Sequence, residues 1–305
     1  MTTALRRSRD PVGPPPCPRC GGPSQYALQA TDRNRGITRS RFSYRRCAQC
    51  GVLWLPEIPP DLAAYYPAGY HHLPAKDELA AEAAAEAPRL ELIARRVGPG
   101  PMVEIGPSHG AFAYAARQAG FDVVGLEMDP LCCEYLRDVV GVQAINTNEP
   151  GAALAEVAPS RAVVMWHVLE HLPDPWGVLR AAAGNLEPGG VLAVATPNPE
   201  SLQFRMFRSR WLHLDAPRHL TLVPLPAMRE ELDRLGLSLV SATARDPVGL
   251  DLNRLGWARS ILRPPALRPD PRLSHTAGRA LTALFAPLET RALCGAAYTA
   301  VFQKR

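Results

Sequence analysis

Residues 103–129 constrain the fold of this chain more than any other stretch of its sequence. A short apolar run ends at Gly106, a turn bounded by Gly106 and Gly110 follows, and an alanine-rich segment leads to a second apolar run that stops at Glu127. Glycine lets the backbone bend sharply and lets a ligand approach it, and alanine favours a helix. The stretch therefore predicts a strand, a turn, a helix and a second strand of an open parallel sheet, which binds its ligand at the carboxyl ends of its strands.

The residues of this turn discriminate between two classes of cofactor. A dinucleotide site would need the pattern G-x-G-x-x-G, whereas here Pro107, Ser108 and His109 separate the two glycines. Glu104 stands two residues before the first glycine, where its carboxylate would repel a pyrophosphate but could hold a cationic amino group. Glu127, which ends the second apolar run, suits a ribose diol.

These residues resemble motif I and the acidic loop of class I S-adenosylmethionine-dependent methyltransferases, except that Ser108 replaces the middle glycine of the usual E/D-x-G-x-G-x-G pattern. The resemblance implies an α/β, Rossmann-like fold with a seven-stranded sheet, and S-adenosylmethionine as the cofactor. The detailed geometry of the turn stays open, and for Asn146 a role in its loop alone is the alternative. The expected cofactor-binding residues are Glu104, Gly106, Ser108, Gly110, Glu127, Met128, Asn146, Trp166 and His167.

A second informative stretch, residues 162–175, reads A-V-V-M-W-H-V-L-E-H-L-P-D-P. Its apolar first half predicts a buried strand, which would deliver the polar residues that follow to the carboxyl edge of the sheet. The signature V-L-E-H-L-x-D-P resembles the motif after the fourth strand of small-molecule methyltransferases of the same superfamily.

Three residues are candidates for the chemistry at this edge: Glu170, His171 and His219. Methyl transfer to oxygen or nitrogen needs a base near an acidic proton, and transfer to carbon needs later removal of a proton. Glu170 is the first candidate, because a carboxylate partly buried among apolar side chains is expected to have a raised proton affinity. It could instead position a substrate hydroxyl or cap the next turn. The histidines are second candidates, as bases or as ligands of a diphosphate-bound cation, with a structural role as the alternative.

Residues 197–224 are expected to shape the acceptor site, because they interleave aromatic and basic side chains. Such a segment could hold an apolar body with a phosphate or carboxylate head, or could stack on and neutralise a nucleic acid. A surface arginine helix with a core-facing aromatic stripe is the alternative. The triplet R-H-L at residues 218–220 resembles one beside the acceptor in related methyltransferases. An aromatic segment at residues 62–72 is either a lid over the pocket or a plug between domains. The expected substrate-binding residues are Tyr65, Tyr66, Phe204, Arg205, Arg208, Trp211 and Arg218.

Two C-x-x-C pairs near the amino terminus, each followed by glycine, predict a metal site formed by Cys17, Cys20, Cys47 and Cys50. Four thiolates can close a tetrahedron around one Zn²⁺ ion, which leaves no position for water and favours a structural over a catalytic metal. Disulfides are the weaker interpretation in a cytosolic chain.

The chain has 305 residues, of which 47% are hydrophobic, enough for one large domain and an accessory module. We expect a disordered tail at residues 1–16, a zinc ribbon with an aromatic linker at 17–75, and a class I methyltransferase domain at 76–305 with an inserted helical segment at about 248–291. The last two strands should pair antiparallel at the sheet edge. No apolar run fits a membrane span and no secretory signal is evident, so we expect a cytoplasmic protein without a membrane partner.

A four-cysteine ribbon followed by the V-L-E-H-L domain resembles zinc-ribbon methyltransferases of bacterial natural-product and sugar pathways. Within that group the chain is similar to the prenyl diphosphate C-methyltransferases of terpenoid biosynthesis, such as those acting on geranyl diphosphate. The resemblance implies methylation of an alkene carbon, with Glu170 as the base and Mg²⁺ helping arginine and histidine residues to hold the diphosphate. The alternatives are a methyltransferase for a nucleotide sugar or another small metabolite, an RNA methyltransferase, and a binding module without catalysis.

We expect the partner to be a small molecule rather than a nucleic acid, because a net charge of +5 is mild for a chain of this length. The inserted segment could cap the pocket or form a subunit contact in a homo-oligomer.

Overall fold

The structure is a computed structural model that describes residues 13–66, 72–262, 271–291 and 293–305. Most of the predicted tail, and most of the proline-rich joint expected at residues 264–271, lie outside the described residues. Among the described helices, none combines the length and the apolar character needed to cross a bilayer.

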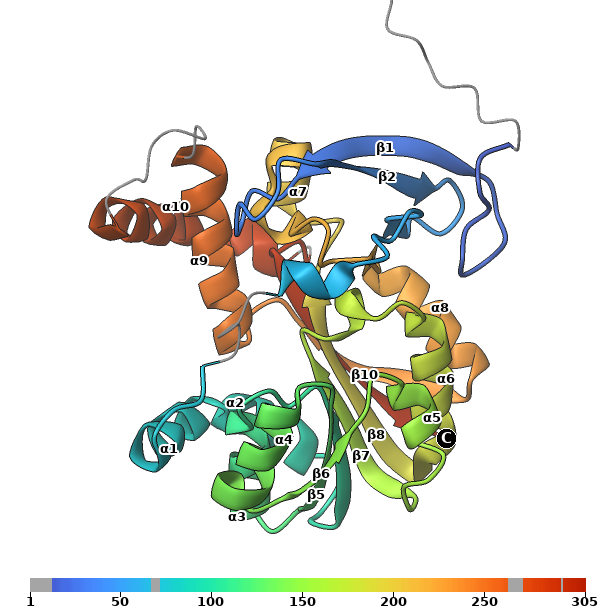
Figure 1. Ribbon diagram of the computed structural model, residues 1–305, viewed down its shortest axis with the longest axis vertical. Coiled ribbons are helices and arrows are strands. Elements are labelled where there is room, and N and C mark those ends of the chain that lie inside the picture. Colours follow the sequence, from blue (N-terminus) through green and yellow to red (C-terminus); the bar gives the residue numbers. More distant parts are fainter. Residues whose placement is uncertain (1–12, 67–71, 263–270, 292) are drawn as a thin grey trace, which may run out of the picture.

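A seven-stranded mixed sheet forms the centre of the molecule, in the order β10-β11-β8-β7-β4-β5-β6 (Figure 1). Strand β11 pairs antiparallel with both β10 and β8, and the other neighbours pair parallel. This confirms the predicted sheet and its antiparallel edge. The strands are β4 (Pro101–Ile105), β5 (Asp122–Glu127), β6 (Gln143–Asn146), β7 (Ser160–Trp166), β8 (Leu186–Pro197), β10 (Leu237–Thr243) and β11 (Ala297–Lys304).

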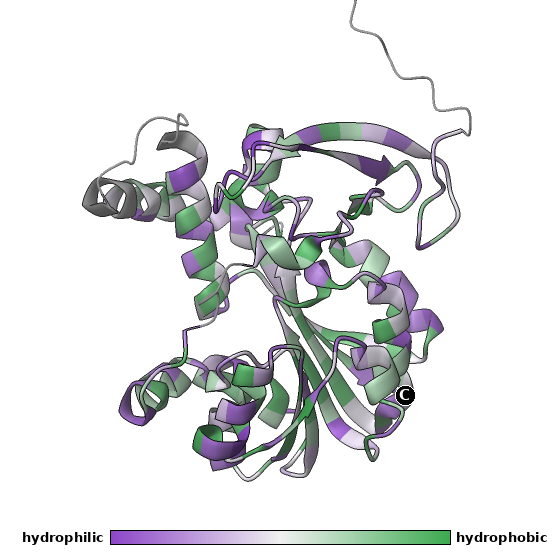
Figure 2. Ribbon diagram, in the orientation of Figure 1, coloured by the Kyte–Doolittle hydropathy of each residue, from purple (hydrophilic) through white to green (hydrophobic). Residues whose placement is uncertain are grey.

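Helices cover both faces of this sheet, which explains why its central strands are apolar on both sides. In β7, Val163 and Met165 pack into the core on one face and Ala162 and Val164 into the core on the other, as the two-residue period of a strand requires. Figure 2 shows the resulting contrast between hydrophobic central strands and the hydrophilic outer sides of the helices.

One face is covered by α1 to α4 and the other by α5, α6 and α8 (Figure 1). The helices are α1 (Lys76–Ala85), α2 (Ala87–Ala94), α3 (Ala111–Gln118), α4 (Pro130–Tyr135) with a π-helical turn η2 (Leu136–Val140), α5 (Pro150–Ala153), α6 (Pro175–Asn185) and α8 (Leu225–Arg234). The helical segment between β10 and β11 consists of α9 (Pro247–Leu262) and α10 (Pro271–Arg291).

Two elements are irregular. The helical stretch after the ribbon is divided at Glu86 into α1 and α2. Strand β8 begins at Leu186, where its pairing with β7 is irregular between Ser160 and Ala162. Gly189 accommodates this irregularity with a φ of 80°, a conformation that glycine adopts without strain.

The amino-terminal cysteine segment forms a second, four-stranded sheet in the order β1-β2-β3-β9, which we call the ribbon sheet. Its first three strands are β1 (Ser24–Thr31), β2 (Arg41–Cys47) and β3 (Leu53–Trp54), whereas β9 (Thr221–Leu222) comes from the segment expected to shape the acceptor site. Leu53 pairs with Leu222, so the ribbon sheet is hydrogen-bonded directly to that segment.

The remaining elements are short and lie near the junction of the two sheets. They are η1 (Leu62–Tyr65), η3 (Leu169–His171), α7 (Leu202–Phe207), η4 (Arg208–Arg210) and η5 (Leu212–Leu214). Figure 1 shows α7 beneath β1, at the end of the central sheet where the ribbon sheet lies.

Candidate active site

The glycine turn after β4 has the geometry of a close ligand approach. Gly106 and Gly110 have φ angles of 67° and 76°, which favour glycine. An added Cβ would lie 2.6 Å from Val168 at Gly106 and 2.5 Å from Leu136 at Gly110, so the packing also excludes side chains at both positions. Ser108, which replaces the middle glycine, adopts a positive φ of 52°. The turn therefore accommodates serine at this position without losing its bend.

Glu104 lies inside this edge of the sheet as a buried acid that lacks a full set of partners. Its side chain is 3% exposed, and its Oε2 atom has no hydrogen-bond partner among the described residues. Burial, followed by repulsion from Glu86, raises the pKa of Glu104 to about 8, although Arg89 opposes this. A ligand with a positively charged amino group would supply both the missing charge and the missing hydrogen bond.

Two further buried polar atoms, which have no hydrogen-bond partner within the described part of the chain, lie at the end of the adjacent strand β7. They are Nε1 of Trp166 and Nε2 of His167, and their sites follow Val164, which pairs with Glu104. Buried polar atoms are nearly always hydrogen-bonded in a complete structure. These orphaned atoms, the carboxyl of Glu104 and the glycine turn together fit S-adenosylmethionine, a cationic, nucleoside-bearing cofactor.

The acidic loop after β5 is held in place by its own backbone. Glu127 accepts hydrogen bonds from the backbone N–H of Ser108 at 2.9 Å and from that of Asp129 at 2.9 Å. Asn146 on β6 donates to the carbonyl oxygens of Glu127 and Met128, so its amide already has a role within the loop. A carboxylate has lone pairs beyond these two bonds, which leaves Glu127 able to accept a ribose hydroxyl. Met128 is 63% exposed beside it.

A buried arginine that sequence reasoning missed lies against this cofactor edge. Arg89 on α2 is 4% exposed, its guanidinium lies 4.7 Å from the ring centroid of Trp166, and it forms an ion pair with Asp246 at 3.2 Å. Phe112 packs on the same tryptophan at 5.0 Å. The sequence around Arg89 shows only an arginine within a predicted helix. Its burial could not be predicted because its partner Asp246 is distant in the sequence.

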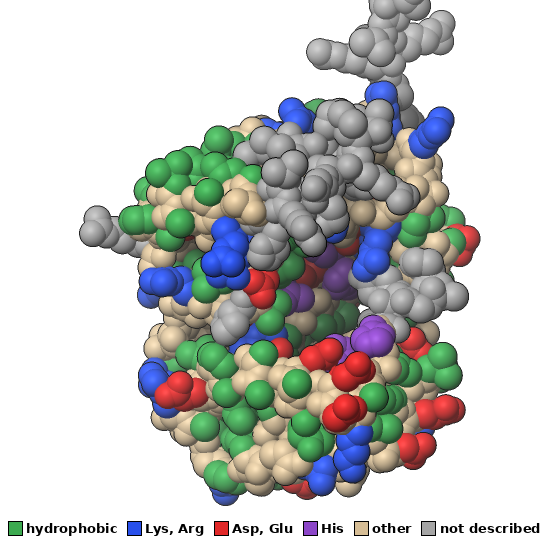
Figure 3. Space-filling view, turned by 90° about the vertical axis from the view of Figure 1, so that its left-hand side faces the viewer, with side chains coloured by type: hydrophobic (Ala, Val, Ile, Leu, Met, Phe, Trp, Pro, Cys, Tyr) green, Lys and Arg blue, Asp and Glu red, His purple; other side chains and the backbone are tan. Residues whose placement is uncertain are grey.

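The three predicted catalytic residues meet in one cluster. Glu170, His171 and His219 each offer a ligand atom, and these atoms all lie within 4.8 Å of one another. The two imidazole rings are T-shaped with centroids 4.7 Å apart. Figure 3 shows that this face of the molecule is hollowed and that histidine and acidic side chains gather in the hollow.

Backbone carbonyls orient both histidines of the cluster. Nδ1 of His171 lies 3.1 Å from the carbonyl oxygen of Arg218, and Nδ1 of His219 lies 2.8 Å from that of His213. A carbonyl oxygen only accepts, so in each ring Nδ1 carries the hydrogen and Nε2 has a free lone pair when the ring is neutral. The cluster can therefore accept a proton or bind a divalent cation.

Glu170 is buried as expected, but its proton affinity is the reverse of the prediction. Its side chain is 1% exposed, and its Oε2 accepts a hydrogen bond from Thr196 at 3.0 Å. Burial alone would raise the pKa of Glu170, but His167, whose Nδ1 is 3.7 Å away, together with His219 and His171 lowers it to about 2. The expected raised pKa of Glu170 is wrong because the sequence shows its apolar neighbours along the chain and not the three histidine rings that face it in the fold.

The pKa of the neighbouring histidine, His171, is lowered as well. Burial, followed by repulsion from His219, lowers the pKa of His171 to about 4. At neutral pH the cluster therefore contains an ionised Glu170 and an uncharged His171. Tyr66 places its hydroxyl 3.1 Å from Nδ1 of His171, which brings this predicted substrate residue to the cluster.

The aromatic residues of the acceptor segment are buried in a core rather than exposed in the hollow. Phe204 and Trp211 are each 1% exposed, and they pack with ribbon residues such as Phe42 and Tyr44. Arg205 and Arg208 lie on the outer side and are exposed. This arrangement favours the alternative of a surface arginine helix with a core-facing aromatic stripe over a pocket lined by these rings.

Arg218 is also placed differently from the expectation that it binds substrate. It is fully buried, and its guanidinium forms ion pairs with Asp32 of the ribbon and Asp215, both at 2.7 Å. Its third nitrogen donates to the carbonyl oxygen of Tyr65 at 3.3 Å. With all three nitrogens engaged, Arg218 has no donor directed to a substrate anion. Sequence reasoning missed the two aspartates, since nothing near them in the chain marks them as its partners.

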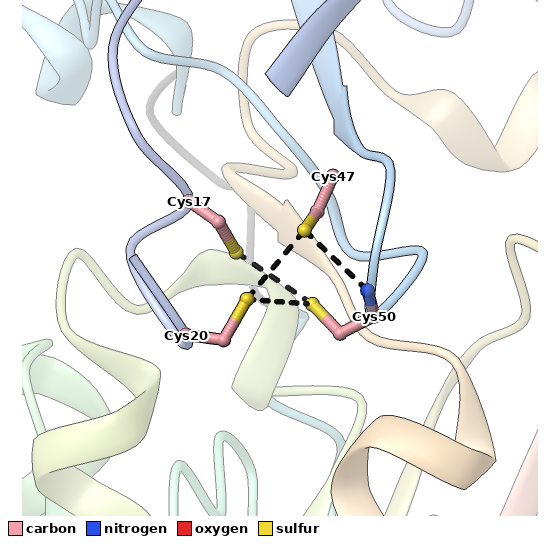
Figure 4. Close-up of side chains that lie close together, drawn as sticks. All are labelled: Cys17, Cys20, Cys47 and Cys50. Carbon is pink, nitrogen blue, oxygen red and sulfur yellow. Dashed lines mark hydrogen bonds between the residues drawn. The ribbon is translucent and has the colours of Figure 1, made fainter. Parts of the chain in front are cut away.

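The four predicted metal-ligating cysteines come together at the end of the ribbon sheet (Figure 4). Sulfur-to-sulfur distances are 3.6 Å for Cys17 and Cys50, 3.6 Å for Cys20 and Cys47, and 3.7 Å for Cys20 and Cys50. Disulfides would require about 2.05 Å, whereas tetrahedral thiolates bound at about 2.3 Å to one Zn²⁺ lie about 3.8 Å apart. The spacing therefore fits a four-coordinate metal ion.

Comparison with known proteins agrees with this geometry. A family described as "Methyltransferase domain" matches residues 77–242, which is 166 of the 305 residues of the chain. The chain is 29% identical over 176 residues to a ubiquinone biosynthesis O-methyltransferase of Pseudomonas fluorescens, covering 55% of this chain and 75% of that protein. It is 31% identical over 124 residues to the protein of the same description from Stutzerimonas stutzeri, covering 38% and 53%.

A solved structure shares the fold at low sequence identity. In the complex between the Haloferax volcanii Trm112 methyltransferase activator and a methyltransferase, one chain aligns with a TM-score of 0.52 and 15% identity, over 81% of this chain and 99% of that one. Because the family match spans more than half of the sequence and the sheet has the class I order, the chain belongs to the methyltransferase domain family and is an S-adenosylmethionine-dependent methyltransferase.

Proposed function

We propose that this enzyme transfers a methyl group from S-adenosylmethionine to a hydroxyl oxygen of a small-molecule acceptor bound at Glu170, His171 and His219. The observation that carries the proposal is the orientation of the two histidines, whose Nδ1 atoms face backbone carbonyl oxygens. Each ring thereby presents Nε2 as a proton acceptor. The relatives named O-methyltransferases support oxygen as the receiving atom.

On the cofactor side, Glu104 would hold the amino group of S-adenosylmethionine and Glu127 its ribose hydroxyls. The cofactor supplies a methyl group on a sulfonium, which an oxygen nucleophile can attack. Trp166 and His167 end strand β7, and Nδ1 of His167 lies 3.7 Å from Glu170. Nε1 of Trp166 and Nε2 of His167, which have no hydrogen-bond partner among the described residues, would contact the cofactor or the acceptor. Ser108, Gly106 and Gly110 would line the turn around the cofactor.

On the acceptor side, we assign His219 as the base. Its Nε2 lies 3.9 Å from Oδ2 of Asp215, and ionised Glu170 is close by, so two carboxylates would stabilise the imidazolium that forms. The acceptor O–H proton passes to Nε2 as the new O–CH₃ bond forms, and the C–S bond breaks to leave neutral S-adenosylhomocysteine. Neutral His171 and Tyr66 would orient the acceptor hydroxyl.

A second candidate is C-methylation of an allylic prenyl diphosphate such as geranyl diphosphate, with Mg²⁺ as a partner of the diphosphate. It is favoured by one observation, the convergence of three possible ligand atoms at Glu170, His171 and His219. Carboxylate oxygen suits Mg²⁺, but a site with two imidazoles suits softer divalent metals better. The burial of Phe204 and Trp211 also removes the aromatic rings that would stabilise a carbocation.

We further propose that the four cysteines bind a structural Zn²⁺ ion. Removal of such an ion would disorder the C-x-x-C turns, which carry Arg19 and its ion pairs with Glu230 and Glu231 of α8. The metal would therefore stabilise the packing of the ribbon on the catalytic domain and would not take part in the reaction.

Incubation with methyl-labelled S-adenosylmethionine tests the proposed acceptor class. Parallel reactions contain phenolic and catecholic compounds, nucleotide sugars, total RNA, and prenyl diphosphates with Mg²⁺. Label on a hydroxyl oxygen supports the proposal, whereas label on a prenyl carbon that requires Mg²⁺ establishes the second candidate. Label confined to RNA would overturn both.

A further inference from the structure

We propose that Asp32, a residue of the ribbon, positions the acceptor-side histidines of the catalytic domain through the guanidinium of Arg218. Asp32 directly follows β1, far from the catalytic motif in sequence. The inference rests on the proposed function, which assigns His171 and His219 to the acceptor. Asp32 itself does not contact the acceptor, so its role is that of a positioning residue.

The carboxylate of Asp32 is held in place by the backbone of the ribbon. Its two oxygens accept hydrogen bonds from the backbone N–H of Arg35 at 3.1 Å and from that of Ile37 at 2.8 Å. These bonds close the loop between β1 and β2 around the side chain, which is 4% exposed. These backbone hydrogen bonds therefore fix the position of the carboxylate relative to the ribbon.

This carboxylate contacts the guanidinium of Arg218 directly. Nη2 of Arg218 lies 2.7 Å from Oδ1 of Asp32 and 2.7 Å from Oδ1 of Asp215, and Nε lies 3.0 Å from Oδ2 of Asp215. A planar guanidinium held by two carboxylates in a buried site has one geometry. Loss of either partner leaves a buried charge incompletely paired, which is costly.

The backbone of Arg218 in turn contacts the cluster of Glu170, His171 and His219. Its carbonyl oxygen lies 3.1 Å from Nδ1 of His171, so the backbone at this residue sets the orientation of that ring. The next residue is His219, whose own carbonyl accepts a hydrogen bond from Tyr44 of β2 at 2.8 Å. The ribbon thus holds this backbone from two sides, by Asp32 through a charge and by Tyr44 through a hydroxyl.

The backbone just before residues 218–219 has a conformation that an isolated segment rarely adopts. Asp215, three residues before Arg218, has a positive φ of 37°, which is uncommon for a residue other than glycine. The tertiary contacts from the ribbon therefore maintain the conformation in which His171 and His219 face Glu170.

The test compares Asp32→Asn with Glu57→Gln in the full-length protein. Glu57 is an exposed carboxylate that follows the first three ribbon strands, and the ion pairs of Arg218 are formed with Asp32 and Asp215 instead, so its variant removes the same charge and leaves those pairs intact. Turnover is expressed per S-adenosylmethionine site titrated by calorimetry, which excludes loss caused by a misfolded fraction. Displacement of catalytic groups by about 1 Å can cost on the order of 100-fold in rate, and we expect a 10- to 100-fold loss in D32N and less than 2-fold in E57Q.

A second readout does not depend on knowing the acceptor. Two-dimensional NMR of ¹⁵N-labelled histidine side chains reports which ring nitrogen carries the proton. In the wild-type enzyme His171 and His219 should show the Nδ1–H form, and in D32N the His171 signal should show a mixture of forms. Asp32→Glu keeps the charge but displaces it, and should give an intermediate result even if D32N does not fold.

Unchanged imidazole signals in the folded Asp32 variants would overturn the inference, as would turnover per cofactor site within 2-fold of wild type. Failure of the proposed function looks different, since the wild-type enzyme would then not methylate a hydroxyl acceptor while the imidazole signals still respond to Asp32. The two hypotheses can therefore fail separately.

Discussion

The backbone N–H of Leu220 donates a hydrogen bond to the carbonyl oxygen of Glu170 at 2.7 Å, which joins the segment of residues 197–224 to the motif after β7. These residues are distant in sequence, yet this bond brings His219, next to Leu220, within ligand distance of Glu170. The acceptor cluster is therefore assembled from two segments, each of which is incomplete alone.

Replacement of His219 tests its role as the base. We expect His219→Gln to lower turnover by roughly 10²- to 10⁴-fold, the contribution usual for a general base, while calorimetry shows unchanged affinity for S-adenosylmethionine. The exposed His72 provides the control variant His72→Gln. Turnover of H219Q within a few fold of H72Q would contradict the assignment.

Glu104 should make cofactor affinity depend on pH. Its pKa of about 8 in the cofactor-free protein means that it is mostly protonated at pH 7 and must ionise to pair with an amino group. Affinity for S-adenosylmethionine should therefore rise from pH 6 to about pH 8 in calorimetry, above which the amino group of the ligand loses its own proton. Glu104→Gln should lower the affinity by roughly 10- to 100-fold and remove this dependence. The exposed Glu187 gives the control Glu187→Gln, which should keep the wild-type profile.

The same group should affect stability in the opposite sense. The folded-state pKa of Glu104 is raised above its unfolded value, so the folded protein binds more protons than the unfolded chain between the two. The free energy of unfolding of the cofactor-free protein should decrease as pH rises from about 4.5 to 8 through this contribution. Thermal melts at pH 8.5 should place the Tm of E104Q above that of wild type, and a lower Tm would show that the buried charge is compensated.

Gly110 should not tolerate a side chain. Gly110→Ala combines a φ of 76° with a Cβ only 2.5 Å from Leu136, and we expect a loss of about 1–3 kcal/mol in stability together with weaker cofactor binding. Gly184 on α6 has no atom within 4 Å of an added Cβ. Gly184→Ala should therefore stabilise the protein by roughly 0.5–1 kcal/mol, as measured by urea denaturation. Equal effects of the two substitutions would refute the steric argument.

The cysteine cluster should bind one Zn²⁺ ion per chain by elemental analysis. Cys20→Ser should lose the metal and lower the Tm, because three thiolates no longer complete the tetrahedron. Cys294→Ser, which alters a buried cysteine outside the cluster, should retain it. Full metal content in C20S would argue against a four-cysteine site.

The sequence by itself predicted the glycine turn with its preceding acid and the grouping of the four cysteines. The turn from Gly106 to Gly110, the acid at Glu104 and the two C-x-x-C pairs act over short distances along the chain, so local spacing is sufficient to specify them. The seven strands were predictable for the same reason, since each apolar run predicts its own strand and the class I order follows from their sequence along the chain.

Only the tertiary structure decided the acceptor half. The lowered pKa of Glu170 depends on histidines brought beside it from other segments, and the burial of Arg218 depends on Asp32 from the ribbon sheet. Electrostatic energies are set by distance and burial in three dimensions, neither of which is encoded in the spacing of residues along the chain. For this reason the sequence named Glu170, His171 and His219 as candidates, which the structure brings together, but it could not assign their protonation or the surroundings of Arg218.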